Sequence, residues 1–555
     1  MNKKINFSKE NKIKFMVTLS GFFLCVCDNI RNTGTGASWA FTNNLLGVFI
    51  FPFIAFRYKL KDFLKLPYYI FTAAVLIAAP FVFKAYAPGT DYDAQVWSGI
   101  LDFLLYGLLF IRLIYQFLEK RNLRKNKEES KTQIKEKALK IKPLFILIFA
   151  FLFFSAISVN QTLWALGFLF MFTSYYLAPL KKEETSLIFE GLMNGIILAF
   201  FVIQSHAFLF RPFDTPRYVG FYQNSNNNAF FYNFVYAAFL GKLSIYKKKM
   251  TLKGADSLKG LKEHLHSPKL HYIITLIFAS SMWCFVLLTM GRISLVGMLA
   301  VSLVYVLTEE LIVYKKGIKG FLKKGFIMAL IFVLMFVPVY SLVRYLPALR
   351  HHPIWFGDYR EDSVFSWDPI DSEKYVSLEE FLNTLLMRTD YSLEDNPMIK
   401  ITPLEFNKGV NLAIYNNIEY NSKLERALGI RRYVYAYFLS ELNLEGHPEL
   451  SPTVQISEDF TASHCHNSFL QCAYCYGILS GLLLLTISLL LPVLTLKKIK
   501  KAQGNPGEFK PEYMFLLSVF VFFFILSLAE TLCFTGQMFF TLLFLLSLPF
   551  TSPEC

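Results

Sequence analysis

Long, continuous apolar runs recur along this chain, and they limit its fold more than any other feature. Each run, as a helix, is long enough to cross the ~30 Å hydrocarbon core of a membrane. The runs do not alternate with polar residues, so they predict helices rather than the strands of a β-barrel. We therefore predict an all-α polytopic membrane protein with about 14 transmembrane helices. The candidate spans lie near residues 13–28, 39–56, 67–86, 96–117, 143–158, 161–180, 187–209, 224–241, 271–289, 293–314, 325–343, 467–496, 512–529 and 532–550. The pairs 143–180 and 271–314 each leave open a single bent element.

Lysine and arginine are distributed unevenly between the segments that separate these runs. If the N-terminus is cytoplasmic, the segments on the cytoplasmic side hold 39 of the 56 Lys and Arg residues. The short segments on the other side contain only Arg31, Arg211 and Arg217. Because basic residues are retained on the cytoplasmic side, this distribution predicts that both termini are cytoplasmic. These basic segments account for the net charge of +15, so we expect the membrane, and no nucleic acid, as a partner.

A long polar segment, residues 344–466, falls on the outer side and holds 11 Lys and Arg against 19 Asp and Glu residues. A connection of this length needs structure of its own. Apolar residues recur at helical spacing in 376–387 and 422–442, so we predict two helices there. The predicted division is N-terminal transmembrane helices over 1–186, central transmembrane helices over 187–343, an extracytoplasmic cap over 344–466 and C-terminal transmembrane helices over 467–555.

Unusual polar residues gather on the outer face that this topology defines. Arg292 interrupts two apolar runs, and an arginine at the centre of a bilayer costs ~2.5–3.5 kcal/mol, so it must face water, a cavity or an anion. Arginine binds phosphate through paired charge-assisted hydrogen bonds, and histidine accepts a proton near neutral pH. We therefore predict a polyanion site with a titratable group. Its candidate residues are Arg217, Asn224, Asn226, Arg292, Arg431, Arg432, His464, His466, Asn467 and Glu530.

Several of these residues also have a purely structural interpretation. The side chain of Arg292 can extend to the membrane interface, and Glu530 can cap a helix in its tight turn. The asparagine run at 224–228 is typical of a turn and a helix N-cap. His464 can simply be exposed, as can the two arginines of the cap. The prediction of a site depends on these groups meeting on one face.

A metal site is a further alternative at the start of the span 467–496. His464, Cys465, His466, Cys472 and Cys475 lie within twelve residues. Cys472 and Cys475 share one face of a helix, as zinc ligands can. However, the cysteines lie one to two turns deeper than the histidines, and small residues are common where membrane helices pack. We therefore predict packing at the cysteines and no metal.

At these residues the sequence resembles the O-antigen ligase/polymerase superfamily, the bacterial membrane glycosyltransferases of the GT-C type. The stretch His466–Gln471, followed by Gly477, is similar to the family's HN-x-x-L helix start with its Gly-x-x-Gly step. Ser480 stands where the second glycine is expected, and Gly481 follows one position late.

Four further positions or segments carry the resemblance. Gly291–Leu295 is similar to the family's Ser-Arg-small helix opening, with Gly in place of Ser. Arg217–Asn226 is similar to its R-x-x-G-x-x-x-N-P-N outer loop, with Ser225 in place of Pro. Gly429–Tyr435 resembles an Arg-containing cap helix, in which either arginine can be the equivalent one, and Glu530 resembles a carboxylate in the final hairpin.

The resemblance covers about residues 187–550 and implies a GT-C-like fold in the inner membrane of a bacterium, without a cofactor. It implies a polyprenyl-diphosphate-linked glycan as donor, and a hydroxyl of a glycan, a lipid or a wall component as acceptor. Because the leaving group is a diphosphate, Arg292 and either Arg431 or Arg432 would stabilise its charge. His466 would deprotonate the acceptor hydroxyl, so that the anomeric centre is inverted.

The remaining candidates would bind and position the substrate. Arg217 would help to place the diphosphate, beside Asn224 and Asn226, which belong to the same loop. Asn467 would hold the helix start that carries His466, and Glu530 would orient this histidine or bind a sugar hydroxyl. His464 would lie beside them.

Two other functions stay open from the sequence. A transporter or flippase of the same lipid needs polar groups along a path through the membrane, whereas the inner halves of the spans are read as nearly free of charge apart from Arg112. A sensor or scaffold would use the acidic cap. Polymerase and ligase share the donor and differ in the acceptor, so the sequence does not separate them.

Overall fold

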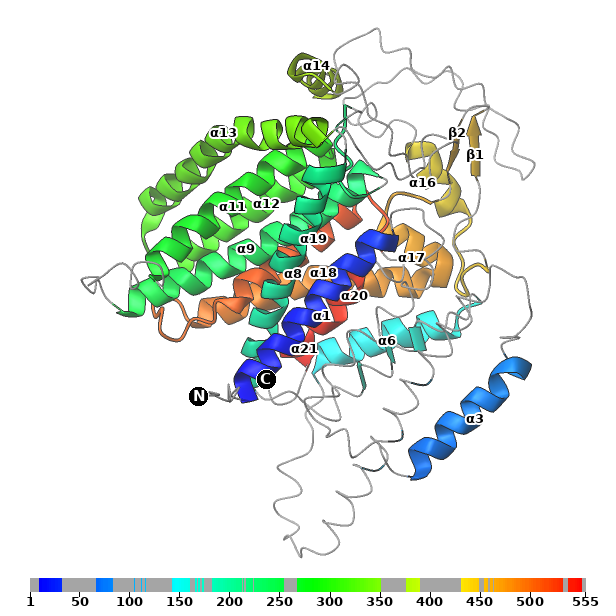
Figure 1. Cartoon of the computed structure of the whole chain (residues 1–555). Helices are drawn as coiled ribbons and strands as arrows, with labels where there is room; N and C mark the ends of the chain where they lie inside the picture. The colour runs from blue at the N-terminus through cyan, green and yellow to red at the C-terminus, as the bar shows by residue number, and fades with distance from the viewer. Residues whose placement is uncertain are drawn as a thin grey trace, which may run out of the picture.

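In the computed structural model, the described part of the chain is helical apart from a short two-stranded ribbon (Figure 1). The structure describes residues 9–31, 66–82, 142–159, 182–211, 216–222, 224–253, 267–350, 376–389, 431–448, 454–457, 460–462, 464–532 and 538–551, with Phe213 and a few other positions between 104 and 173. The predicted spans at 39–56 and 96–117, and most of 161–180, lie outside these residues.

The helices follow one another along the chain with few strands between them. They are α1 (Lys9–Arg31), α3 (Leu66–Val82), α6 (Pro143–Ile157), α8 (Lys182–Phe210), α9 (Ser225–Lys253), α11 (Pro268–Thr289), α12 (Arg292–Leu307), the π-helical turn η2 (Thr308–Val313), α13 (Gly317–Arg350), α14 (Leu378–Thr389), α16 (Arg431–Ser440), α17 (Ser468–Tyr476), α18 (Ile478–Lys501), α19 (Glu512–Ser527), α20 (Met538–Leu546) and α21 (Leu548–Thr551). The antiparallel strands β1 (Val454–Ser457) and β2 (Phe460–Ala462) precede α17.

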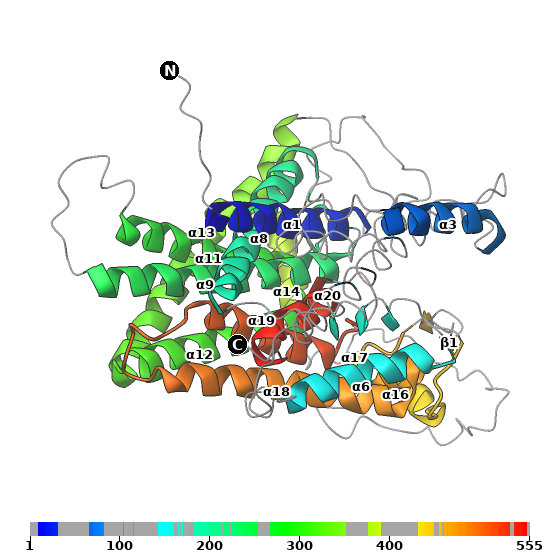
Figure 2. The same cartoon turned by 90° about the horizontal axis from the view of Figure 1, so that it is seen from below.

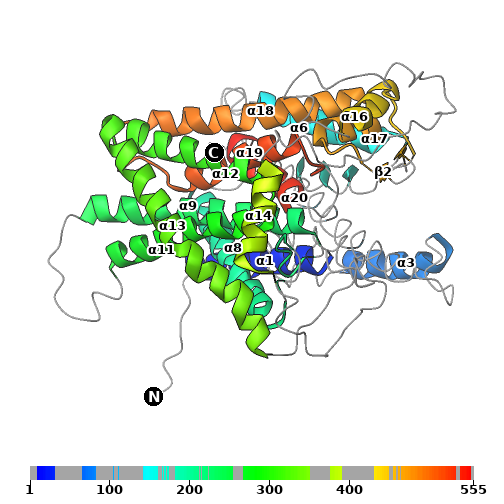
Figure 3. The ribbon, with the colours of Figure 1, turned by 90° about the horizontal axis from the view of Figure 1, so that it is seen from above.

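Helix α19 lies in the interior of the bundle, where it contacts α9, α12 and α18. Its apolar residues cover the whole circumference, and a helix of that kind is stable only when it is surrounded by other elements. Around it, α6 runs along α18 on one side of the bundle, and α1 packs along α8 on the opposite side (Figures 2 and 3). The core therefore forms around α19 and the equally buried first half of α9.

Five described helices are long and apolar enough to cross a membrane, and α6 and α19 are apolar but shorter. Helix α13 is the least buried of the five, and it exposes Val333, Leu334 and Val337. Apolar side chains that face outward suit contact with lipid tails rather than with water. The chain is therefore a polytopic helical membrane protein. The five spans are Glu184–Phe210, Pro268–Thr289, Arg292–Val313, Gly317–Pro347 and Ile478–Lys501.

Several helices continue past the predicted ends of their spans. Helix α9 reaches Lys253 rather than residue 241, and α13 reaches Arg350 rather than residue 343. Helix α13 therefore extends seven residues into the segment predicted as the cap. Charged side chains do not end a helix, because they extend from its surface; Arg344, for example, donates from Nε to the carbonyl oxygen of Val376 at 2.9 Å.

The predicted pair 271–314 is two helices rather than one bent helix. Met290 adopts a left-handed conformation with φ 51° and ends α11, and Gly291 then precedes α12. The chain reverses there. The evidence is that Glu309, beyond the end of α12, lies close enough to Tyr272, near the start of α11, to act on it electrostatically. The reversal places Arg292 at the start of a helix at one end of the bundle.

The predicted span 467–496 is not continuous: it breaks at Gly477 into α17 and α18. Gly477 has φ 89° and ψ 155°, a conformation that is essentially restricted to glycine. Helix α17 folds back on α18, where a Cβ at Gly481 would collide with Ala473 and with the carbonyl oxygen of Phe469. The close packing of α17 on α18 therefore depends on Gly477 and Gly481. Position 480, where the resembling family has its second glycine, is a serine in this chain.

Replacement of Gly477 by alanine is expected to destabilise the protein by ~3 kcal/mol, because a side chain is strained at this φ and its Cβ would collide with the carbonyl oxygen of Leu444. The measurement is the apparent melting temperature of the purified protein in detergent. Gly325→Ala is the matched control, since no atom lies within 4 Å of a Cβ there. Equal melting temperatures for the two variants would contradict the conformation assigned to Gly477.

The two helices predicted in the cap are present within its described residues. Helix α14 covers most of the predicted 376–387, and Phe381 packs against Tyr340 of α13. Helix α16 covers the second half of the predicted 422–442, and residues 422–430 lie outside the described residues. After α16, the turn at Gly446 docks on the α17–α18 break, where Ile478 N donates to Asn443 O at 2.9 Å.

Buried charges lie at the end of the bundle away from Arg292, and the sequence reading that the inner halves are nearly free of charge is wrong. Glu309 is fully buried and pairs with Lys247 at 2.9 Å and with Lys324. Glu310 pairs with Lys247 as well and lies 3.9 Å from Lys324. We call these four residues the Lys–Glu quartet; it joins α9, η2 and α13. Two lysines and two carboxylates balance, so the burial of each charge is compensated by its partners.

Candidate functional site

The final turn before the C-terminal helices carries Glu530, and α17 fixes its position. Ser468, the first residue of α17, donates from Oγ to the carbonyl oxygen of Glu530 at 2.8 Å and accepts from Leu532 N at 2.7 Å. Asn467 Nδ2 donates to Leu528 O at 3.1 Å. These bonds attach the turn to the start of α17. The side chain of Glu530 is 9% exposed, so its carboxylate needs polar partners.

Three side chains from distant segments supply those partners. Arg431 Nη2 donates to Glu530 Oε1 at 3.2 Å, and Nη1 donates to Ala529 O at 2.9 Å. Asn226 Nδ2 donates to the same Oε1 at 3.3 Å. His466 Nδ1 lies 3.4 Å from the other oxygen, Oε2. Glu530 is thus the shared partner of Arg431 of α16, Asn226 of α9 and His466, which precedes α17.

A second arginine joins the cluster through Asn226. Arg217 donates from Nη2 to Asn226 Oδ1 at 2.6 Å and from Nε to the carbonyl oxygen of Thr289 at 3.1 Å. Thr289 is the last residue of α11, so Arg217 ties the loop before α9 to the α11–α12 reversal. The hydrogen-bonded chain Arg217–Asn226–Glu530 therefore runs toward Arg431. We call Arg217, Asn226, Arg431, His466 and Glu530 the Glu530 cluster.

His466 has an unusual backbone conformation. Its φ is 52°, which non-glycine residues adopt rarely, and its carbonyl oxygen accepts from Tyr435 OH at 3.3 Å. When Nδ1–H donates to Glu530, the other ring nitrogen Nε2 carries the lone pair. Nε2 makes no hydrogen bond with any residue that the structure describes. The ring is 27% exposed, so this nitrogen is available to a substrate.

The asparagines at 224 and 467 cap helices, as the structural interpretation of such residues predicts. Asn467 Oδ1 accepts from Phe469 N and Leu470 N, each at 3.0 Å, at the start of α17. Asn224 Oδ1 accepts from Asn226 N at 2.8 Å before α9. Each cap satisfies backbone N–H groups that have no partner within the helix. Asn224 and Asn467 therefore position Asn226 and His466.

His464 lies against His466 of the cluster, and Arg292 follows Thr289, whose carbonyl oxygen Arg217 binds. Arg292 is exposed at the start of α12, three residues after the carbonyl group that Arg217 binds. The ring centroids of His464 and His466 are 4.3 Å apart. Burial, and to a lesser degree His466, lowers the pKa of His464 to about 4, so His464 is neutral at physiological pH. The Arg432 side chain lies outside the described residues.

The cysteines near α17 are packed in the interior. Cys465, Cys472 and Cys475 are fully buried, and Cys465 Sγ lies 2.9 Å from the carbonyl oxygen of Asn467. Burial raises the pKa of the Cys465 thiol to about 12, so the thiolate that binds zinc is disfavoured there. Within the residues that the structure describes, no group of three or more His, Cys, Asp or Glu side chains is arranged to hold a metal ion.

Three supporting residues were given no role in the sequence reading. Tyr435 holds the carbonyl group of His466, Ser468 holds the Glu530 turn, and Gln471 Oε1 accepts from Cys465 N at 2.9 Å, which fixes the loop before His466. The role of Ser468 could have been predicted, because serine at a helix start commonly makes hydrogen bonds to the backbone. The role of Tyr435 could not, since its contact joins residues 31 positions apart.

In comparisons with known proteins, no family model, no curated protein and no solved structure matches the chain.

Proposed function

We propose that this protein is a membrane glycosyltransferase of the O-antigen ligase/polymerase type, and that the Glu530 cluster is its active site. The observation that carries the proposal is that Arg431, His466 and Asn226 meet around the buried carboxylate of Glu530, with Arg217 joined to them through Asn226. The donor is a polyprenyl-diphosphate-linked glycan, and the acceptor is a hydroxyl of a glycan, a lipid or a wall component. The motifs that resemble this superfamily contain every residue of the cluster.

The residues suit an inverting transfer. The acceptor oxygen forms a bond to the anomeric carbon while the bond from that carbon to the diphosphate oxygen breaks. The acceptor's proton passes to His466 Nε2, and the bonding electron pair leaves with the polyprenyl diphosphate. Glu530 keeps Nδ1 protonated and stabilises the imidazolium that forms. Arg431 and the exposed Arg292 would hold the diphosphate, because charge grows on its oxygens as the bond breaks.

With this function we propose the membrane arrangement that the sequence predicts. The chain has about fourteen spans in a GT-C-like arrangement, in the inner membrane of a bacterium, with both termini cytoplasmic and the Glu530 cluster on the outer side. The uneven distribution of lysine and arginine supports this orientation.

The test is turnover by the purified protein in lipid nanodiscs. With a polyprenyl-diphosphate oligosaccharide and an acceptor, we expect a new glycosidic bond of opposite anomeric configuration and release of polyprenyl diphosphate. EDTA is expected to leave the rate unchanged. Absence of transfer with every class of acceptor hydroxyl would contradict the function, and loss of activity on chelation would contradict a metal-free mechanism.

A second candidate is transport of the same lipid-linked glycan. The Lys–Glu quartet favours it, because buried charges at the opposite end of the bundle are what a polar path through a membrane requires. Proteoliposomes separate the two functions: a transporter moves the lipid-linked glycan between leaflets without an acceptor and without breaking the diphosphate bond.

A further inference from the structure

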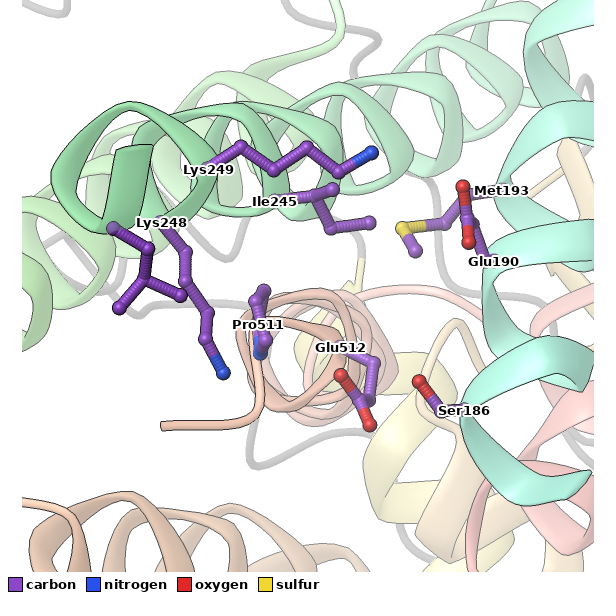
Figure 4. Close-up of a pocket in the computed structure, with 9 residues that line it drawn as sticks. Ser186, Glu190, Met193, Ile245, Lys248, Lys249, Pro511 and Glu512 are labelled. Carbon is purple, nitrogen blue, oxygen red and sulfur yellow. The ribbon is translucent and has the colours of Figure 1, made fainter. Parts of the chain in front are cut away.

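A pocket of about 220 Å³ lies between α8, α9 and the start of α19 (Figure 4). Helix α8 contributes Ser186, Glu190 and Met193, and α9 contributes a second wall that includes two lysines. The pocket is far from the Glu530 cluster. Helix α9 runs from Asn226 in that cluster to Lys248 in the pocket, which is about 33 Å at the helical rise per residue. The two sites are therefore separate.

Glu512 points to a ligand in this pocket. Glu512 is only 7% exposed, and its side chain makes no hydrogen bond or ion pair with any residue that the structure describes. Glu512 and the Lys248 ammonium interact electrostatically. A buried carboxylate without a hydrogen-bonding partner is costly, so a cationic donor in the pocket would be stabilising.

A second carboxylate lies on the neighbouring wall, but it is already neutralised. Glu190 Oε1 pairs with Lys242 at 3.4 Å and with Lys14, so it attracts a further cation less strongly than Glu512 does. Ser186 adds a hydroxyl group to the wall that α8 forms. The acidic side of the pocket thus offers one unpaired carboxylate and further oxygen acceptors, which matches an ammonium group with several N–H donors.

The wall that α9 forms carries two lysines, which extend in different directions. Lys248 donates to the carbonyl oxygens of Gly507 and Phe509 at 2.9 and 2.5 Å and keeps one N–H free of those bonds. Figure 4 shows Lys249 extending toward the side of Glu190 and Met193, whereas Lys248 extends toward Pro511. The Lys248 ammonium, with its remaining N–H, is therefore the cation on this side that suits a phosphate diester.

Apolar side chains complete the lining. Ile245 and Met193 line the pocket, and Leu252 is 60% exposed beside them. A free phosphate ester would gain nothing from these groups, whereas the glycerol and first methylenes of a phospholipid would be removed from water there. The pocket therefore combines an ammonium site, a phosphate site and an apolar exit.

We propose that this pocket binds the headgroup of a zwitterionic phospholipid with a primary ammonium, of the phosphatidylethanolamine class. The ammonium group is held by Glu512 and Ser186, the phosphate by Lys248, and the chains leave along Leu252. A phosphatidylcholine headgroup has the same charges, but its trimethylammonium has no N–H to donate. An anionic phosphatidylglycerol headgroup has no cation for Glu512.

The test is native mass spectrometry of the delipidated protein with an equimolar mixture of dioleoyl phosphatidylethanolamine, phosphatidylcholine and phosphatidylglycerol. We expect the ethanolamine lipid to be retained preferentially. Glu512→Gln is expected to reduce its preference over the choline lipid by roughly tenfold, because one hydrogen bond to a charged group is lost. Glu508→Gln is the matched control, since Glu508 is exposed in the preceding loop and does not line the pocket.

Three results would overturn the proposal. Equal retention of the three lipids would mean that Lys248 attracts any phosphate, and an unchanged preference in Glu512→Gln would rule out the ammonium site. Binding of glycerophosphoethanolamine as strong as that of the full lipid would assign the pocket to a soluble phosphoester. The apparent melting temperature of Glu512→Gln, measured in parallel, verifies that the variant is folded.

Discussion

His466→Ala is expected to lower the rate of glycan transfer by ~10²–10⁴-fold, the range that a positioned general base contributes. The reason is the geometry of its ring: Nδ1 lies 3.4 Å from Glu530 Oε2, and Nε2 is left for the acceptor hydroxyl. The measurement is kcat in nanodiscs with the polyprenyl-diphosphate donor at saturation. Retention of at least half of the wild-type kcat would contradict the assignment of the base.

Two further variants separate this role from a general loss of structure. His271→Gln is the matched control, because His271 stacks on Tyr246 at the end of α9 away from the Glu530 cluster, and it is expected to keep its activity. Glu530→Gln combined with His466→Ala should lose little more activity than His466→Ala alone, since groups that act as one unit are not additive. Losses that multiply independently would show that Glu530 acts through Arg431 or on the substrate, and not through the histidine.

Lys324→Met is expected to lower the free energy of unfolding by ~3–5 kcal/mol, because it removes one partner from a buried ion pair and leaves a carboxylate uncompensated. Lys324 pairs with Glu309, which is fully buried, and donates to Tyr305 OH at 3.1 Å. The measurement is the apparent melting temperature in detergent.

The adjacent lysine provides the control for this effect. Lys323 is exposed on the same helix, and Lys323→Met is expected to change the melting temperature little. Addition of Glu309→Gln to Lys324→Met should restore part of the stability, because it removes the uncompensated charge. A melting temperature of Lys324→Met equal to that of Lys323→Met would show that the quartet does not stabilise the fold.

Apolar periodicity and helix-capping patterns accounted for much of the local structure. The long apolar runs predicted the helices α8, α11, α12 and α18 in the described part of the chain, because each run must be covered by lipid or by other helices. Asn467 was predicted to hold a helix start, and it caps α17. Local rules of this kind act within a few residues, which is why a single sequence reveals them.

Contacts between distant segments were harder to predict. The candidate list contained every residue of the Glu530 cluster, but nothing in the sequence specified that Glu530 would bind both Arg431 and Asn226. The Lys–Glu quartet was missed because Glu309 and Glu310 stand at the end of a long apolar run, where hydropathy alone treats them as the edge of a span. The break at Gly477 was missed for a related reason: its apolar neighbours continue the run on both sides.

The position of Glu530 in the chain also bears on how the protein is made. Glu530 leaves the ribosome after Arg217 and Asn226, which precede it by more than 300 residues. Until the final turn docks on Ser468, Arg431 lacks the carboxylate that it binds in the finished protein. A nascent chain that is arrested or cleaved before residue 530 is therefore without a complete cluster.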